Sequence, residues 1–360
     1  MAHLQSLEIK NFRCFQDIKL SFDSSIIFIQ GDNGTGKTAL LETIYYLCYL
    51  KSFRSHIPRE LIRFDSDSFF LRGTFAHEAE ENVLQVGLVP QKKVVKINGK
   101  PVKSFQDLFN CARVISLTES DLFVIQGGPE KRRSFIDNLI FLHEPEFAKE
   151  IRLYKNILSQ RTALLQKNFS DDDLYHLWTK KLWKASIKIK NLRISYLKKL
   201  SILLEDIIEQ YPIDQPLSLA YCCKQEYSES FEIFSQNYLF MKNREMRLQR
   251  TLFGAHLDDI GIYWNKAEAR LFASRGQQKL IILLLKIAQA QGLNKENGLC
   301  IMLLDDFVTD FDLKRIRQTL EILTNLRCNL FFSCAQKNSI LEQELNKYNV
   351  QKVDLEAFER

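Results

Sequence analysis

The sequence lacks features that are typical of several protein classes. Its eight cysteines are scattered and no two are spaced Cys-x-x-Cys, so neither a zinc site nor a thioredoxin-like motif is predicted. Residues 1–10 contain no apolar core of the kind found in signal peptides. The most apolar run, residues 280–285, ends at Lys286 and is too short to span a bilayer. We therefore expect a cytoplasmic protein with reduced cysteines and no membrane-embedded segment.

Internal repeats and low-complexity tracts are also absent. The composition is that of an ordinary soluble globular protein, with 46% hydrophobic and 26% charged residues. At 360 residues the chain is large for one hydrophobic core, which predicts two lobes. The net charge of +6 permits an acidic partner such as nucleic acid, although a solubilising excess of basic residues accounts for it more simply.

The strongest motif is a phosphate-binding loop at residues 31–38, which fits the pattern G-x-x-x-x-G-K-[ST]. An apolar, β-branched strand is predicted before it at 26–29, and a helix after it at 39–47. Glycines let successive backbone N–H groups turn toward a phosphate, and the helix N-terminus adds partial positive charge. We predict that ATP binds here, with Lys37 reaching the outer phosphates and the Thr38 hydroxyl ligating Mg²⁺. The nucleotide-binding residues predicted from the loop are Gly31, Asp32, Asn33, Gly34, Thr35, Gly36, Lys37 and Thr38.

Two carboxylates complete a hydrolytic site. Asp305 and Asp306 follow the apolar run 299–304, which is the Walker B pattern of a buried strand that ends in acids. We predict that Asp305 holds the Mg²⁺ shell and that Asp306 orients or deprotonates an attacking water. Asp306 and Lys37 are therefore the predicted catalytic residues.

A third element precedes a predicted apolar helix at 280–290. Residues 273–278 resemble the S-x-G-Q signature of ABC-type ATPases, in which a serine hydroxyl and glycine N–H groups form a phosphate site at a helix start. Ser274, Gly276 and Gln277 are expected to act on the nucleotide of a facing subunit. Residues 309–312 stand where such proteins carry the D-loop, and Asp312 is its predicted functional residue.

The order of the predicted elements describes one nucleotide-binding lobe that is split by a helical insertion. We expect a hairpin at 7–22 against the P-loop strand, strands at 69–75, 83–88 and 93–100 with a turn signal at Asn98-Gly99, and strand structure again near 217–222. Helices are expected at 130–142, 145–167 and 174–210, before α/β character returns. The predicted fold class is α/β: an ABC-type P-loop ATPase head, with a parallel sheet core and an antiparallel β-subdomain, plus a helical arm. The predicted domains are 1–121 and 246–360 for the ATPase lobe and 122–245 for the arm.

Together these motifs resemble the RecF family of bacterial recombination mediators, which is related to SMC proteins. The resemblance covers most of the chain and rests on residues 11–13, 34–38 with 41–42, 51–54, 127–137, 254–259, 276–278 and 303–306. Generic ABC ATPases lack the segments 51–54 and 127–133. The resemblance also places Arg13 among the nucleotide-binding residues. The chain departs from the family at Glu119-Ser120, Ala255, Leu257, Arg275, 310–311 and Cys334-Ala335, which marks it as a divergent member.

The resemblance implies an ATP-bound homodimer that binds single- and double-stranded DNA at gaps. It also implies help in loading RecA together with RecO and RecR, and weak DNA-dependent ATPase activity with Mg²⁺. Two alternatives stay open: a nucleotide-switched binding or scaffold protein with negligible hydrolysis, and an ABC-type ATPase subunit of another assembly. SMC-type cohesion is disfavoured because no long heptad repeat is present.

A basic helix is the candidate DNA-binding element. Residues 178–204 contain no acid, and their lysines include the candidate contacts Lys181, Lys184 and Lys188. The alternative is an ordinary solvated helix face. Since no base-reading motif is present, any DNA binding is expected to be independent of sequence and sensitive to salt.

Overall fold

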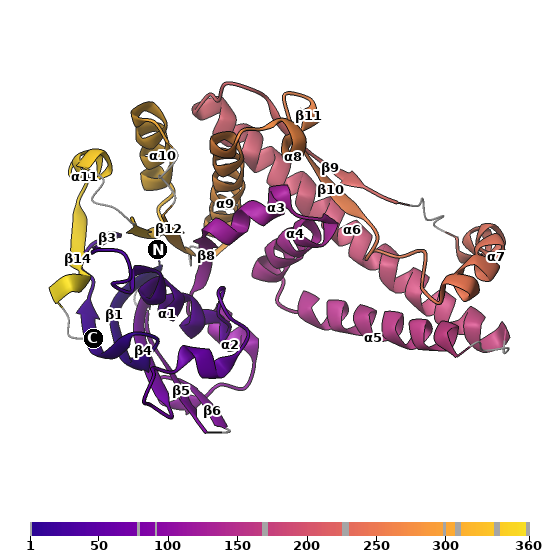
Figure 1. Cartoon of the computed structure of the whole chain (residues 1–360), viewed down its shortest axis with the longest axis horizontal. Coiled ribbons are helices and arrows are strands. Elements are labelled where there is room, and N and C mark those ends of the chain that lie inside the picture. Colours follow the sequence, from indigo (N-terminus) through magenta and orange to yellow (C-terminus); the bar gives the residue numbers. More distant parts are fainter. Residues whose placement is uncertain are drawn as a thin grey trace. The chain divides into compact units, whose positions relative to one another are not determined.

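The computed structural model describes most of the chain (Figure 1). The described residues are 2–77, 80–90, 92–167, 172–224, 230–297, 300–306, 311–334 and 339–357. They form two compact units, each assembled from separate stretches of sequence. The first comprises Met1–Leu122, Leu203–Ile213 and Ser274–Arg360, and the second comprises Phe123–Ile202 and Asp214–Ala273.

The two units differ from the predicted division at two places. The second unit continues to Ala273 rather than ending at 245, and residues 203–213 pack with the first unit. The long helix α6 (Asp172–Gln210) therefore contributes to both units. The two units describe which residues pack together, whereas domain boundaries at 121 and 245 stay a prediction.

A five-stranded parallel sheet forms the centre of the first unit. Its strand order is β14-β3-β13-β12-β8, and every neighbouring pair is parallel. β12 and β13 are apolar along almost their whole length because both faces of the sheet are covered. The strands are β3 (Ile26–Gln30), β8 (Arg113–Leu117), β12 (Cys300–Asp305), β13 (Asn329–Ser333) and β14 (Val350–Asp354).

A six-stranded antiparallel sheet forms the rest of this unit's β-structure, in the order β2-β1-β4-β5-β6-β7. The predicted hairpin at 7–22 exists, but it belongs to this sheet, in which β1 pairs with β4, and not to the sheet of the P-loop strand β3. The predicted turn at Asn98-Gly99 joins β6 to β7. The strands are β1 (Ala2–Phe12), β2 (Phe15–Ser21), β4 (Phe69–His77), β5 (Glu80–Val89), β6 (Lys92–Ile97) and β7 (Lys100–Pro101).

Helix α1 (Lys37–Tyr49) packs against strands of both sheets, which explains why nearly all of its residues are buried. α9 (Arg275–Asn297) packs against β8 and β12 and begins within the predicted signature rather than at 280. The other helical segments of this unit are η1 (Pro58–Leu61), α2 (Phe105–Phe109), η2 (Glu119–Leu122), α10 (Leu313–Asn325), α11 (Ser339–Leu345) and η3 (Leu355–Ala357).

The second unit is mainly helical, as predicted. Besides its part of α6, it contains α3 (Phe123–Gln126), α4 (Pro129–His143), α5 (Phe147–Gln166), α7 (Phe231–Leu248) and α8 (Ala269–Phe272). A small antiparallel sheet joins β9 (Leu217–Cys222), β10 (Asp259–Trp264) and β11 (Ala267–Glu268). The sequence predicted β9 but not β10.

Ion pairs hold the second unit together internally. Arg132 donates to both carboxylate oxygens of Asp259 at 2.8 Å, and Arg193 donates to those of Asp137 at 2.7 and 2.9 Å. Arg133 donates to the Asp258 backbone carbonyl at 2.7 Å. The arginines in the 127–137 motif therefore have structural partners within the unit. Among the described segments, none of the helices has the length and apolar character needed to cross a membrane.

Candidate nucleotide-binding site

The parallel sheet brings the predicted site residues together. In such a sheet, the carboxyl ends of all strands lie on one edge, where ligands bind. The P-loop follows β3, Asp305 ends β12, and Ser333 ends β13 in register with Asp305. Thr118 and Glu119 follow β8, the neighbour of β12 on its other side. Four strands that are distant in sequence thus contribute to one edge.

The P-loop has the backbone conformation that its glycines allow. Gly31, Gly34 and Gly36 have φ values of 142°, 83° and 101°, which side chains strongly disfavour. A Cβ on Gly36 would also lie 2.7 Å from Cys14 Sγ, so this position requires glycine. Lys37 donates from Nζ to the carbonyls of Gly31 and Asp32 at 2.7 and 2.8 Å. Its ammonium therefore lies directly over the loop in which a phosphate would be held.

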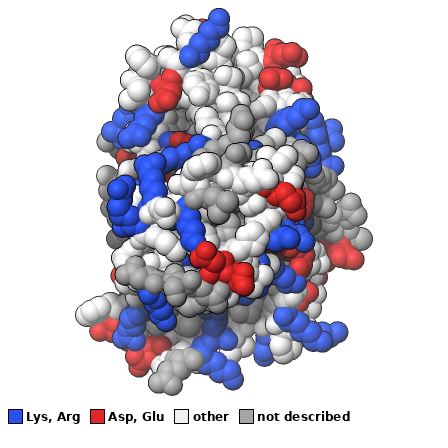
Figure 2. All heavy atoms as spheres, turned by 90° about the vertical axis from the view of Figure 1, so that its right-hand side faces the viewer, with Lys and Arg blue, Asp and Glu red and all other residues white. Residues whose placement is uncertain are grey.

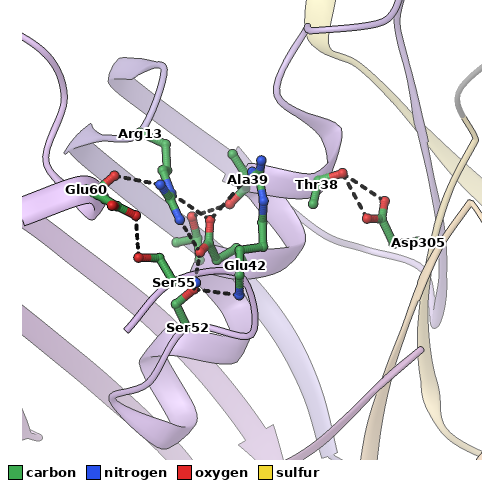
Figure 3. A network of polar contacts seen from close by, with 10 residues as sticks. Arg13, Thr38, Ala39, Glu42, Ser52, Ser55, Glu60 and Asp305 are labelled. Atoms are coloured by element: carbon green, nitrogen blue, oxygen red, sulfur yellow. Dashed lines mark hydrogen bonds and ion pairs between the residues drawn. The ribbon is translucent and has the colours of Figure 1, made fainter. Parts of the chain in front are cut away.

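The predicted magnesium ligands are adjacent. Thr38 Oγ1 donates to the Asp305 carboxylate, with distances of 2.8 and 3.1 Å to its two oxygens (Figure 3). Ser333 Oγ donates to the same carboxylate at 2.5 Å. Asp306 follows with φ 51°, and its backbone N–H donates to the Ser333 carbonyl at 3.2 Å. A hydroxyl and a carboxylate side by side are oxygen donors of the type that Mg²⁺ prefers, so the residues fit a magnesium nucleotide.

Arg13 is held by a buried carboxylate on α1. It donates from Nε and Nη2 to the two oxygens of Glu42 at 2.8 and 2.7 Å, and from Nη1 to the Glu60 carbonyl at 2.6 Å. The Glu42 side chain is 0% exposed. Ser52 donates to Glu42, and its oxygen accepts from the backbone N–H groups of residues 54 and 55. Figure 3 shows how this network joins the hairpin tip, α1 and the segment 51–54.

A cleft of about 880 Å³ opens over the P-loop within the first unit. Its described lining includes many of the predicted residues: Arg13, Asn33, Gly34, Gly36, Lys37, Thr38, Asp305 and Asp306. Gly31, Asp32 and Thr35 are not in that lining; Thr35 is buried and donates to the Asp32 carbonyl. The sequence analysis did not predict seven further charged or hydroxyl-bearing lining residues, namely Arg54, Glu60, Thr118, Glu119, Arg275, Lys279 and Ser333. Most of them lie within or just after a predicted strand or motif, whereas Glu60 has no such signal.

The signature residues form a reciprocal helix cap. Ser274 N–H donates to Gln277 Oε1 at 2.8 Å, and Gln277 N–H donates to Ser274 Oγ at 3.3 Å, which is the capping-box arrangement. Ser274, Gly276 and Gln277 are not among the described residues that line the cleft. Arg275 does line it and forms an ion pair of 3.0 Å with Glu119. At the start of α9, Arg275 therefore lines the cleft of its own chain, whereas Ser274 does not.

Asp312 caps α10. Its side chain accepts from the Arg315 backbone N–H at 2.8 Å, as expected for an aspartate at an N-cap. The preceding D-loop residues 309 and 310 lie outside the described residues. Asp312 thus has a structural role, and its functional role in the D-loop stays a prediction.

The three candidate DNA contacts are exposed on α6 within the second unit, but they are not equivalent. Lys188 forms an ion pair of 2.7 Å with Glu150 of α5. Lys181 Nζ lies 4.7 Å from the ring centroid of Trp178 on its own helix. Lys188 is therefore already partly neutralised, whereas the charges of Lys181 and Lys184 face solvent.

Comparisons with known proteins agree with this geometry. Residues 3–357 match the family model described as the RecF/RecN/SMC N terminal domain. The DNA replication and repair protein RecF of Leptospira interrogans is 34% identical over 318 residues, covering 87% of this chain and 86% of that protein. RecF of Clostridioides difficile is 27% identical over 99% of this chain and 98% of that protein.

Solved structures give the same result. A RecF–ATP structure, described as a recombination mediator of the RecFOR pathway, superposes with a TM-score of 0.81 and 27% identity, covering 94% of this chain and 93% of that one. An SMC head domain of Pyrococcus furiosus shares the fold at a TM-score of 0.54 and 14% identity, covering 96% of this chain and 92% of that one. The predicted ABC-type ATPase fold is confirmed.

Proposed function

Because this chain belongs to the RecF family of the RecF/RecN/SMC group, we propose that it is an ATP-dependent DNA-binding protein of DNA replication and recombinational repair. The observation that carries the proposal is the meeting of Lys37, Thr38, Asp305 and Ser333 at one sheet edge beneath the cleft. ATP and Mg²⁺ are the proposed cofactors. Together with RecO and RecR, the protein assists RecA loading at gaps, and slow hydrolysis resets it.

Each residue of the site has a distinct proposed task. Lys37 holds the outer phosphates, and Thr38 and Asp305 hold Mg²⁺. Asp306 orients the attacking water. Arg13 lines the same cleft, and its bidentate ion pair with Glu42 fixes the orientation of its guanidinium beside the nucleotide.

Three substitutions separate these tasks. Lys37→Ala should abolish measurable ATP binding, because the loop loses its cation. Asp306→Asn should bind ATP normally and hydrolyse it at least about 100-fold more slowly, whereas Asp305→Asn should also require more Mg²⁺. An unchanged rate in Asp306→Asn would remove Asp306 from catalysis. Normal ATP binding by Lys37→Ala would contradict the nucleotide site itself.

The active unit is a two-fold dimer in which Ser274 acts on the partner's nucleotide. Ser274 Oγ accepts the Gln277 N–H but keeps its own proton to donate, and the first N–H groups of a helix have no carbonyl partner within it, so both can serve a phosphate. Ser274→Arg should bind ATP as a monomer and fail to dimerise in gel filtration. Mixing it with Lys37→Ala should restore part of the ATPase activity, because one composite site then carries neither defect. ATP-dependent dimerisation of Ser274→Arg would exclude this arrangement.

A further inference from the structure

Helix α7 (Phe231–Leu248) of the second unit carries an apolar side chain that nothing in the described chain covers. Phe240 is 89% exposed, which is the largest exposed fraction among the large hydrophobic side chains described. Ile233 on the same helix is 54% exposed. Single exposed apolar side chains are common on proteins, so the charges around Phe240 decide whether it can belong to a binding site.

The orientation of α7 is determined by its opposite face. Phe234 stacks on Tyr238 with ring centroids 5.2 Å apart, and both rings contact Phe253. Glu245 is fully buried and accepts from the fully buried Arg161 at 2.5 Å. Rotating α7 to hide Phe240 would break this buried ion pair, at a large cost in stability. The exposure of Phe240 is therefore imposed by the packing.

The exposed face is basic. Helical spacing places residues 233, 240, 244 and 247 on one side of α7, and both Arg244 and Arg247 are exposed. The only acids in α7 are Glu232 in its first turn and the buried Glu245. We call the side formed by Ile233, Phe240, Arg244 and Arg247 the α7 face.

The start of α7 packs against the basic helix α6 through its buried side. Phe231 at the start of α7 contacts the rings of His176 and Trp183, and Lys180 Nζ lies 5.3 Å from the Phe231 ring centroid. The face shown in Figure 2 carries broad patches of Lys and Arg, interspersed with smaller ones of Asp and Glu. The acid-free part of α6 and the α7 face therefore belong to neighbouring helices of the same unit, and both carry exposed cations.

We propose that the α7 face binds single-stranded nucleic acid, with a base stacked on Phe240 and neighbouring phosphates held by Arg244 and Arg247. This inference rests on the proposed DNA-binding function and names one of its contact sites. Base–aromatic stacking needs an unpaired base, which a duplex does not offer, and it tolerates any sequence. Two arginines one turn apart beside the ring supply the charge complementarity that a phosphate backbone requires.

The test compares the affinities of the full-length protein with ATP for three probes: labelled oligothymidylate, an abasic strand of the same length and a duplex. Phe240→Ala should bind oligothymidylate about tenfold more weakly, with little change for the duplex or the abasic strand. Phe240→Trp should restore the affinity, whereas Phe240→Leu should not, since leucine keeps an apolar surface without a π face. Arg244→Gln with Arg247→Gln should weaken binding of all three probes and reduce the salt slope by about one to two.

The matched control is Phe64→Ala, because Phe64 is 86% exposed in the first unit and should leave every affinity unchanged. Wild-type affinity in Phe240→Ala, or full activity of Phe240→Leu, would overturn the stacking site. If Phe240→Ala instead lost only the binding of RecR, the face would be a protein-docking surface and the proposal would be wrong. Failure of the wild-type protein to bind any of the three probes would overturn the DNA-binding function and this site with it.

Discussion

Glu42→Ala tests whether the family-typical segment 51–54 is organised by one buried carboxylate. Glu42 is the shared acceptor of Arg13 and Ser52 and is inaccessible to solvent. Removing it leaves a guanidinium that is only 17% exposed without its bidentate partner. Breaking a buried ion pair from one side costs about 3–5 kcal/mol, and the slight exposure of Arg13 favours the lower end, about 3 kcal/mol. Glu42→Gln should cost about 1–2 kcal/mol, because its amide oxygen still accepts one hydrogen bond.

The measurement has to be local, because two compact units need not unfold together. Hydrogen exchange followed by mass spectrometry should show faster opening of α1 and of residues 51–55 in Glu42→Ala, with the second unit unaffected. The double variant Arg13→Met, Glu42→Leu should recover much of the loss, because neither charge is then stranded. The exposed pair Arg59–Asp67 is the matched control, and Asp67→Asn should change little. Unchanged protection of α1 in Glu42→Ala, or additive effects in the double variant, would refute the reasoning.

Three further predictions follow from single contacts. Ser333→Ala removes a donor to the proposed magnesium ligand Asp305, so a Mg²⁺ titration of the ATPase should show about tenfold weaker apparent affinity; an unchanged titration would contradict that role. Burial and nearby arginines lower the pKa of His256 to about 4, so the unfolded state binds more protons than the folded state between pH 6.5 and 4. The free energy of unfolding should therefore decrease by about 2–3 kcal/mol as the pH falls from 6.5 to 4, and by less in His256→Asn. An equal dependence of the unfolding free energy on pH in both proteins would refute this prediction. Lys184→Glu should weaken DNA binding and lower its salt slope by about one, whereas Lys188→Glu should do less because Glu150 already pairs with Lys188; equal effects would contradict this ranking.

The sequence alone was sufficient for the features that are local in the chain. The P-loop, its preceding strand and its following helix are contiguous, so periodicity and glycine spacing predict them together. The same holds for Asp305 at the end of an apolar strand and for the long helix α6, whose residues 178–204 contain no acid. The order of these motifs also predicted the α/β class, which the structure and its relatives confirm.

Tertiary structure decided what depends on strand order and side-chain direction. Ser333 and Glu119 enter the site only because β13 and β8 flank β12, and no local pattern specifies which strands are neighbours. The hairpin at 7–22 pairs with β4, which lies far away in the sequence, so no local pattern could predict this partner or its register. Glu42 could not be assigned from its place in α1, since its role arises from Arg13 and Ser52 reaching the same buried point. Likewise, the amphipathic sequence of α7 is compatible with either face inward, and the buried Arg161–Glu245 pair decides that Phe240 faces solvent.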